Sequence, residues 1–426
     1  MSRTLALAIV VLVSGCGSRC KEVADARTAL VTRAASTHRE PDLEVRVPFD
    51  RANTLLEALL HAEPLTVPLK IPDLGPIEVT VNGLTADVRE VRLRAGAPDH
   101  LRFAVRIEIR DDEQVITTLA VVAEVRPVLE RKDDAAELVI GFGPENLLAL
   151  APELGPDATR LLGAAVNRWV PAKLRDRVPR PLLDLAASRL GAHLRTTAYE
   201  QLRTTLLHRL GELTRLRLQL PDVPVANVTI RSTDRTLVVG IATALPVRRG
   251  LTPQGQAEDA ADADVSVRIS GSAVAELANW AIEHGHAPRW YDRSLKPRPD
   301  GELRPRFDYV AEDRGHPLKV YAFQERGGCS YFRVGVRPAV AMDGERVKAT
   351  VLDRELERRS ASPVIEWLAW MKYFLTGWVD RSKQVAAHTR LVAGHRALET
   401  RVVGASLGHD ELSFTLRFVG SSSDGR

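Results

Sequence analysis

Hydrophobic and polar residues alternate along several short segments of the chain, which is the pattern of strands that bury one face. The clearest row covers residues 101–110, where apolar side chains at odd positions alternate with charged ones, Ala104 excepted. Further strand-like rows cover 43–48, 77–81, 119–125, 216–220, 228–230, 237–241, 307–309, 320–323, 331–336, 347–351, 402–405 and 412–418. Because many of these rows follow one another without an intervening helical pattern, they predict antiparallel sheets.

Two stretches follow the helical period instead. Between residues 182 and 213, apolar residues, leucines except for Ala198, recur every four positions from 190 to 210 with arginines off the row, which predicts a long amphipathic helix with one apolar stripe. A second helix is predicted from about 362 to 393. One face of it carries the aromatic residues Trp367, Trp370, Phe374 and Trp378. That face either packs into a core, as apolar helix faces usually do, or contacts lipid at an interface, where tryptophan is enriched.

The order strand-then-helix occurs twice. Residues 43–48 alternate and lead into a helical pattern, and residues 265–269 do the same, with Ser270 or Ser272 as the helix cap. Each half also ends in a hairpin pattern, with Asp234 in one polar turn and Asp410 in the other. We therefore predict an α+β fold of two tandem modules, 43–247 and 264–420, joined by a polar linker at 248–263. Each module would be a curved antiparallel sheet wrapped around a long helix, and residues 421–426 would be a disordered tail.

The amino terminus has the pattern of a bacterial secretory signal. Arg3 precedes the apolar run 5–13, which at nine residues is far shorter than the roughly 20 that span a bilayer. The run ends in Val13-Ser14-Gly15-Cys16, which resembles the lipobox of bacterial lipoproteins. The resemblance implies that residues 1–15 are removed and that Cys16 becomes the acylated first residue, and Gly17 favours sorting to the outer membrane. Residues 16–42 are predicted to be a tether that is partly helical around 23–34.

Two further cysteines, Cys20 and Cys329, leave two possibilities open. In an oxidising envelope compartment they can form a disulfide. Cys20 lies in the predicted tether, however, and nothing in the sequence places it next to Cys329. The pairing is therefore not predicted from the sequence.

Composition and charge exclude several functional classes. The chain has 426 residues, of which 45% are hydrophobic and 27% charged, so it is neither a low-complexity nor a disordered chain. No second long apolar run follows the amino-terminal one, which excludes a multispan membrane protein. The net charge of +4 is spread among 55 carboxylates without a basic run, so a nucleic-acid partner is not predicted.

No enzymatic chemistry is predicted from the motifs. The sequence Gly-Ala-Ser-Leu-Gly at 404–408 matches a hydrolase elbow in letters, but a strand pattern follows it where that motif needs a helix. His284 and His286 lack further ligands at a fixed spacing, and the aspartates at 259, 262 and 264 lack the glycine and glutamate of a calcium loop. We therefore predict a protein that is not an enzyme and that needs no metal or cofactor.

The predicted architecture itself favours a lipid ligand, because a gap between a curved sheet and a long helix is an elongated apolar tunnel. The strand at 43–47, the helix after it and Pro68-Leu69-Lys70-Ile71-Pro72-Asp73 also resemble the opening of the tubular lipid-binding superfamily, which includes bactericidal/permeability-increasing protein. The resemblance implies two modules joined end to end that bind phospholipid or lipopolysaccharide acyl chains. The predicted tunnel lining is Leu101, Phe103, Val105, Leu119, Val121, Leu194, Leu202 and Leu206.

The predicted fold and amino-terminal signal are compatible with two functions from different classes. The first is a protein anchored to the outer membrane through Cys16 that binds or transfers lipid. The alternative is a structural or adaptor lipoprotein of the cell envelope whose modules are fully packed and bind protein partners. A filled core would favour the adaptor, and an open apolar tunnel would favour the lipid carrier.

Overall fold

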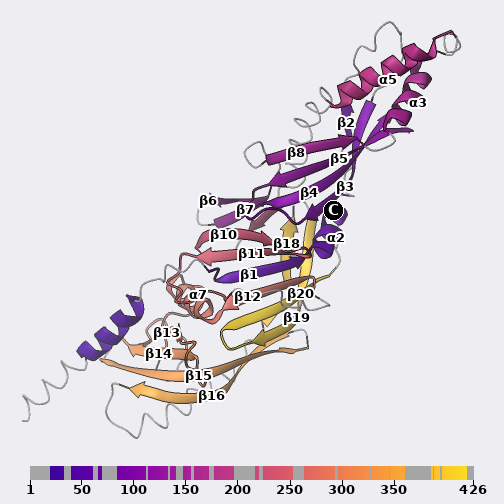
Figure 1. Cartoon of the computed structure of the whole chain (residues 1–426). Helices are drawn as coiled ribbons and strands as arrows, with labels where there is room; N and C mark the ends of the chain where they lie inside the picture. The colour runs from indigo at the N-terminus through magenta and orange to yellow at the C-terminus, as the bar shows by residue number, and fades with distance from the viewer. Residues whose placement is uncertain are drawn as a thin grey trace, which may run out of the picture.

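The computed structural model describes residues 20–32, 40–60, 66–69, 84–111, 114–132, 135–140, 147–154, 158–171, 177–195, 216–219, 224–252, 263–292, 296–326, 328–344, 346–359, 385–386, 388–393 and 396–419. Within these ranges the fold is α+β and rich in sheet, and every strand pair within its sheets is antiparallel, as the alternating rows predicted. The molecule is elongated, with sheets following one another along its length (Figure 1). Among the described helices, none is long and apolar enough to span a membrane.

The centre of the molecule is a seven-stranded sheet that takes strands from both halves of the chain. Its order is β10 (Val225–Ser232), β11 (Thr236–Thr243), β1 (Leu43–Pro48), β12 (Val265–Ser270), β20 (Glu411–Val419), β19 (Arg396–Leu407) and β18 (His388–Ala393). β1 and β12 pair at its middle, with Val45 opposite Val267. The two strands that the sequence analysis compared are therefore neighbours, and each has the hairpin of its own half on its outer side.

Each of these two central strands runs directly into a helix, as predicted. α2 (Phe49–Leu60) follows β1, and α7 (Gly271–Glu283) follows β12. The hydroxyl of Ser270 accepts a hydrogen bond from the amide of Ala273 at 3.1 Å, so Ser270 is the cap of α7. Of the two candidates, the structure thus selects the first.

An asparagine in each of these helices fastens it to a strand of the neighbouring sheet. The Asn53 side chain accepts from the amide of Leu93 at 2.6 Å and donates to the carbonyl of Leu93 at 3.2 Å. Asn279 makes the same two bonds with Phe307, both at 2.8 Å. An amide side chain can satisfy both backbone groups of one residue, so each asparagine takes the place of a neighbouring strand.

The larger sheet of the first half has the order β2 (Thr66–Leu69), β3 (Leu84–Arg94), β4 (Leu101–Asp111), β5 (Gln114–Val125) and β8 (Leu147–Leu154). A smaller sheet contains β6 (Val128–Lys132), β7 (Ala135–Ile140) and β9 (Leu216–Gln219). Two helices, α3 (Ala158–Trp169) and α5 (Arg180–Arg195), lie at the far end of this half (Figure 1). α5 covers the start of the long helix predicted for 182–213, and residues 196–215 lie outside the described part.

The second half contributes a sheet of β13 (Leu303–Tyr309), β14 (Leu318–Gln324), β15 (Ser330–Asp343), β16 (Arg346–Arg359) and β17 (Val385–Ala386). The helix predicted for 362–393 is wrong over its last residues, because β17 and β18 occupy 385–386 and 388–393. β18 pairs along its whole length with β19, and this long-range pairing overrides the local preference. The predicted strand 77–81 and residues 360–384 lie outside the described residues. The arrangement of a sheet wrapped around a long helix therefore stays a prediction.

The predicted tether contains a helix at residues 20–31 that packs against the body of the protein. Val23 and Leu30 are buried against an aromatic cluster of Tyr321, Phe323 and Tyr331. A disulfide joins Cys20 to Cys329 across 309 positions of sequence. A part of the predicted tether, where a helix was expected around 23–34, is thus packed against the body, and the pairing that the sequence left open is formed.

Candidate functional site

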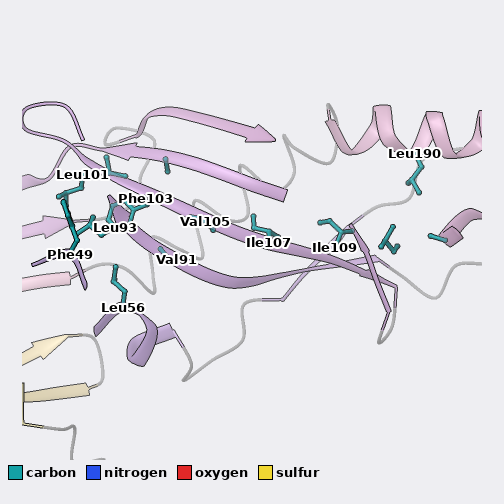
Figure 2. Packing of buried hydrophobic residues seen from close by; sticks show 14 of the residues in the cluster. Phe49, Leu56, Val91, Leu93, Leu101, Phe103, Val105, Ile107, Ile109 and Leu190 are labelled. Atoms are coloured by element: carbon teal, nitrogen blue, oxygen red, sulfur yellow. The ribbon is translucent and has the colours of Figure 1, made fainter. Parts of the chain in front are cut away.

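The candidate site is an apolar strip along β4, made of Leu101, Phe103, Val105, Ile107 and Ile109. All five side chains are at most 4% exposed, while the residues between them point to the opposite face of the strand. At about 3.4 Å per residue, the strip is about 27 Å long. Figure 2 shows these side chains in a row along the strand.

Neighbouring strands widen the strip into an apolar surface. Val91 and Leu93 of β3 lie beside it, with Val91 opposite Val105 and Leu93 opposite Phe103. On the other side, Ala123 and Val125 of β5 are buried in the same cluster. The surface therefore spans three strands, because each strand alternates in phase with its neighbour across the sheet.

Helices from distant parts of the sequence close the two ends of the strip. Phe49 and Leu56 of α2 belong to the cluster at the Leu101 end (Figure 2). At the Ile109 end lies Leu190 of α5 (Figure 2), and Trp169 of α3 donates its indole N–H to the carboxylate of Asp111, the last residue of β4. The buried tryptophan therefore keeps a polar partner at the rim of the apolar surface.

A surface hollow of about 390 Å³ opens beside the Leu101 end. Phe49 and Leu93, which belong to the apolar cluster, form part of its wall. The rest of the lining is mostly polar and comes from α2, β3 and the β10–β11 turn: Asp50, Asn53, Thr54, Arg92, Arg94, Ala95 and Asp234. The volume lies within the roughly 300–1,000 Å³ of small-molecule pockets.

The opposite face of β4 is held by ion pairs. Arg102 donates to Glu124 at 2.6 Å, and Glu108 receives hydrogen bonds from Arg89 at 2.9 Å and Arg110 at 2.8 Å. Burial raises the pKa of Glu108, but the hydrogen bonds and charges of these two arginines outweigh it and leave the pKa below its usual range. The two faces of β4 thus differ sharply in polarity, which fixes the strand's register against its neighbours.

The structure places only part of the predicted tunnel lining. Leu101, Phe103 and Val105 lie together on the strip. Leu119 and Val121 are on β5, opposite Ile107 and Val105 in the strand register, and Leu194 is near the end of α5; the positions of these three side chains are not described. Other predicted residues lie outside the described ranges: Cys16, Leu202, Leu206, Trp367, Trp370, Phe374 and Trp378.

Several members of the cluster were missing from the predicted lining. Ile107 and Ile109 continue the same alternating row, so their period was the available signal. Phe49, Trp169 and Leu190 reach the strip from helices that are distant in sequence from β4. No local pattern connects those helices with this strand.

The histidines, Asp264 and the segment 404–408 that the sequence analysis considered for metal or catalytic chemistry lie in the described part of the chain, while Asp259 and Asp262 lie outside it. His284 and His286 both stack on Trp280, with ring centroids 4.6 and 5.0 Å away. Asp264 accepts a hydrogen bond from the amide of Phe418 at 2.7 Å, which joins two strands of the central sheet. The segment 404–408 lies in the β19–β20 hairpin, with a strand after it. Among the described residues, no three histidine, cysteine or carboxylate side chains gather as metal ligands do.

Comparisons with known proteins give similarity at the level of solved structures alone. No family model matches the chain, and no curated protein matches it. P47 of Clostridium botulinum E1 aligns with a TM-score of 0.41 at 9% identity, over 88% of this chain and 98% of P47. A lipopolysaccharide binding protein aligns with a TM-score of 0.27 at 11% identity, over 89% and 99% of the two chains. P47 from Clostridium botulinum A2 gives 0.35 at 8% identity, over 88% and 96%. These scores are too low to transfer a function, which has to come from the residues of this chain.

Proposed function

We propose that this protein is a lipoprotein of the bacterial envelope that binds a lipid acyl chain along the apolar strip of β4. The single observation that carries the proposal is the strip itself, a continuous apolar row about 27 Å long at the strand rise of about 3.4 Å. The hydrocarbon core of a bilayer is about 30 Å thick, so one acyl chain spans about 15 Å. The strip is long enough to lie along such a chain.

The hollow beside Phe49 and Leu93 supports the same proposal. Its wall joins polar side chains to two members of the apolar cluster. A lipid has the same division, because its headgroup is polar and its chains are not. In the proposed complex, the headgroup lies in the hollow near Arg92 and Arg94, and the chain runs from there along the strip.

The amino-terminal sequence supplies the envelope part of the proposal. A charged start, a short apolar run and Val13-Ser14-Gly15-Cys16 together favour export and acylation of Cys16. In this proposal the outer membrane holds the protein through that cysteine, because each buried methylene of an acyl chain contributes about 0.8 kcal/mol. The protein would then hold or move lipid without covalent chemistry.

One observation favours the adaptor alternative. The strip residues are at most 4% exposed, covered by the protein's own residues. Such burial is what a closed, fully packed core also shows. In that case the protein is an envelope adaptor, and its partners bind its outer surface.

Replacing Ile107 with tryptophan separates the two functions. If a lipid lies on the strip, the larger ring displaces it, and the lipid that co-purifies with the protein falls while the unfolding midpoint changes little. If the core is closed, overpacking lowers the free energy of unfolding by about 1–3 kcal/mol. Mass spectrometry of extracted lipid and a denaturation curve on the same preparation give both values. Arg106→Trp is the matched control, because Arg106 is exposed on the opposite face of β4.

Replacing Cys16 with serine tests the anchor. We expect wild-type protein in the outer-membrane fraction and the variant in a soluble or uncleaved form, since serine offers no thiol for acylation. Fractionation followed by mass measurement of the amino-terminal peptide checks this. A Cys16→Ser variant that stays in the outer membrane unchanged would show that the anchor is elsewhere.

A further inference from the structure

The sheet β13–β16 has a strand that is buried on both faces. Val320 and Ala322 of β14 point into one apolar cluster with Phe332 and Val334. The residues that alternate with them, Tyr321 and Phe323, are 5% and 2% exposed and belong to a different cluster. A strand of a single sheet buries both faces only if other elements cover both faces of the sheet at that strand.

That covering element is the helix at 20–31. Val23, Ala26 and Leu30 lie on one side of it, at the spacing of a helix face, against Tyr321, Phe323 and Tyr331. Arg27 forms an ion pair with Glu325 at 3.2 Å. The disulfide Cys20–Cys329 then ties the first residue of the helix to the turn between β14 and β15.

We infer that this docked helix makes the β13–β16 end of the molecule the end that faces the membrane. The inference rests on the acylation of Cys16 proposed above. Cys20 follows Cys16 by four positions, and four steps of extended chain reach about 14 Å at most. The turn that carries Cys329 is therefore held close to the bilayer.

The consequence is an upright orientation of the elongated body. The helix at 20–31 lies beside β13 and β14 at one end of the molecule, and α3 and α5 lie at the opposite end (Figure 1). With one end held at the bilayer, the sheet that carries the apolar strip projects away from the anchoring membrane. Any lipid or protein partner that binds at α3 and α5 then approaches from the side away from the anchoring membrane.

The β13–β16 end, to which the disulfide fastens the helix at 20–31, has side chains of the kind that contact a bilayer surface. The guanidinium of Arg326 lies 3.9 Å from the ring centroid of Trp290, and that of Arg289 lies 6.0 Å from it. Both arginines are exposed, as are Lys296 and Arg298. Acidic residues also lie in these segments: Asp292, Asp300, Glu302 and Glu325. Of these four, only Asp300 is exposed. Asp25 and Glu283 are exposed at the same end, but so are Lys21 and Arg27, and the exposed basic residues remain more numerous than the acidic ones. Tryptophan with exposed basic residues is typical of contact with anionic lipid headgroups.

Energy transfer to the bilayer measures the orientation. The full acylated protein is reconstituted into vesicles of phosphatidylethanolamine and phosphatidylglycerol that contain an acceptor-labelled lipid. A donor dye is placed by an unnatural amino acid at position 298, at the β13–β16 end, or at position 189 on the exposed side of α5. We expect transfer from 298 to exceed that from 189 by about threefold, because the anchor reaches only about 14 Å.

A variant that releases the helix supplies the decisive comparison. It combines Cys20→Ser, Cys329→Ser, Val23→Asp and Leu30→Asp. After the helix, the next described hydrogen bonds to the rest of the protein are at Pro41, whose carbonyl accepts from the Leu251 amide at 2.8 Å, and at Asp42, whose carboxylate accepts from the Thr243 amide at 2.7 Å. The chain from Cys16 to Asp42 reaches about 90 Å when extended, so transfer from 298 should fall to the level of 189. Val31→Asp, on the exposed side of the helix, is the matched control and should keep the difference.

The outcomes separate this inference from the proposed function. Wild-type protein that does not float with vesicles has no acyl anchor, which overturns the anchor proposal and the orientation with it. Protein that floats but shows equal transfer from 298 and 189 overturns the orientation alone. A releasing variant that keeps the wild-type difference shows that something other than the helix sets the orientation.

Discussion

Replacing Glu44 with alanine should lower the free energy of unfolding by about 2–3 kcal/mol, because the buried Arg268 loses one of its two carboxylate partners and keeps only Glu411. Glu44 lies in the middle of the central sheet at 2% exposure. Its carboxylate receives hydrogen bonds from Arg46 at 2.7 Å, from Arg268 at 3.0 Å and from Arg231 at 3.5 Å. Of these, Arg268 is 6% exposed and cannot recover its hydration by a small movement. Urea denaturation of the purified protein measures the loss.

A double variant shows how much of the loss comes from the missing Glu44–Arg268 attraction and how much from keeping the Arg268 charge buried without Glu44. Glu44→Leu combined with Arg268→Met removes both buried charges. Glu411 also loses its contact with Arg268, but its side chain is partly exposed and can be hydrated, so much of the lost stability should return. Glu312→Ala, at an exposed glutamate, is the control and should change the free energy of unfolding by less than about 0.5 kcal/mol. If Glu44→Ala behaves like Glu312→Ala, the ion pairs at the β1–β12 junction do not stabilise the fold.

This junction also explains why part of the fold was predictable. The strands β1 and β12 each alternate and each lead into a helix, which are local patterns that a sequence displays. Which strands pair with each other in the sheet cannot be predicted from such local patterns. The pairing of β1 with β12 joins positions in the two halves of the chain, and no period in the sequence specifies it. The same reason accounts for the error at 388–393, where pairing with β19 decides the conformation.

The candidate site was predictable to a similar extent. Alternation along β4 identified Leu101, Phe103 and Val105 as one face, because a single strand displays its own period. Its ends were not predictable, since Trp169 and Leu190 approach from helices whose positions depend on tertiary packing. In β14 the sequence Val-Tyr-Ala-Phe held an unused signal. Apolar residues in both phases of one strand indicate that both faces are covered.

The helix at 20–31 covers one face of β14, and replacing Phe323 beneath it with alanine is expected to have the second large effect on stability. Phe323 is 2% exposed, and its ring stacks between those of Tyr321 and Tyr331 at 5.8 and 5.5 Å. Truncation opens a cavity beneath the helix at 20–31, and the expected loss is about 3–5 kcal/mol in the free energy of unfolding. Urea denaturation under non-reducing conditions measures it with the Cys20–Cys329 bond intact.

A second truncation on the helix side shows whether this loss comes from docking. Val23 and Phe323 belong to the same cluster, so Val23→Ala should cost less in the Phe323→Ala background than in the wild type. Val31→Ala is the control, because Val31 is 52% exposed and should change stability equally in both backgrounds. Fully additive losses for Val23 and Phe323 would mean that the two side chains do not share a packed interface. The helix would then be held by the disulfide and the Arg27–Glu325 ion pair, and reduction would leave only the ion pair.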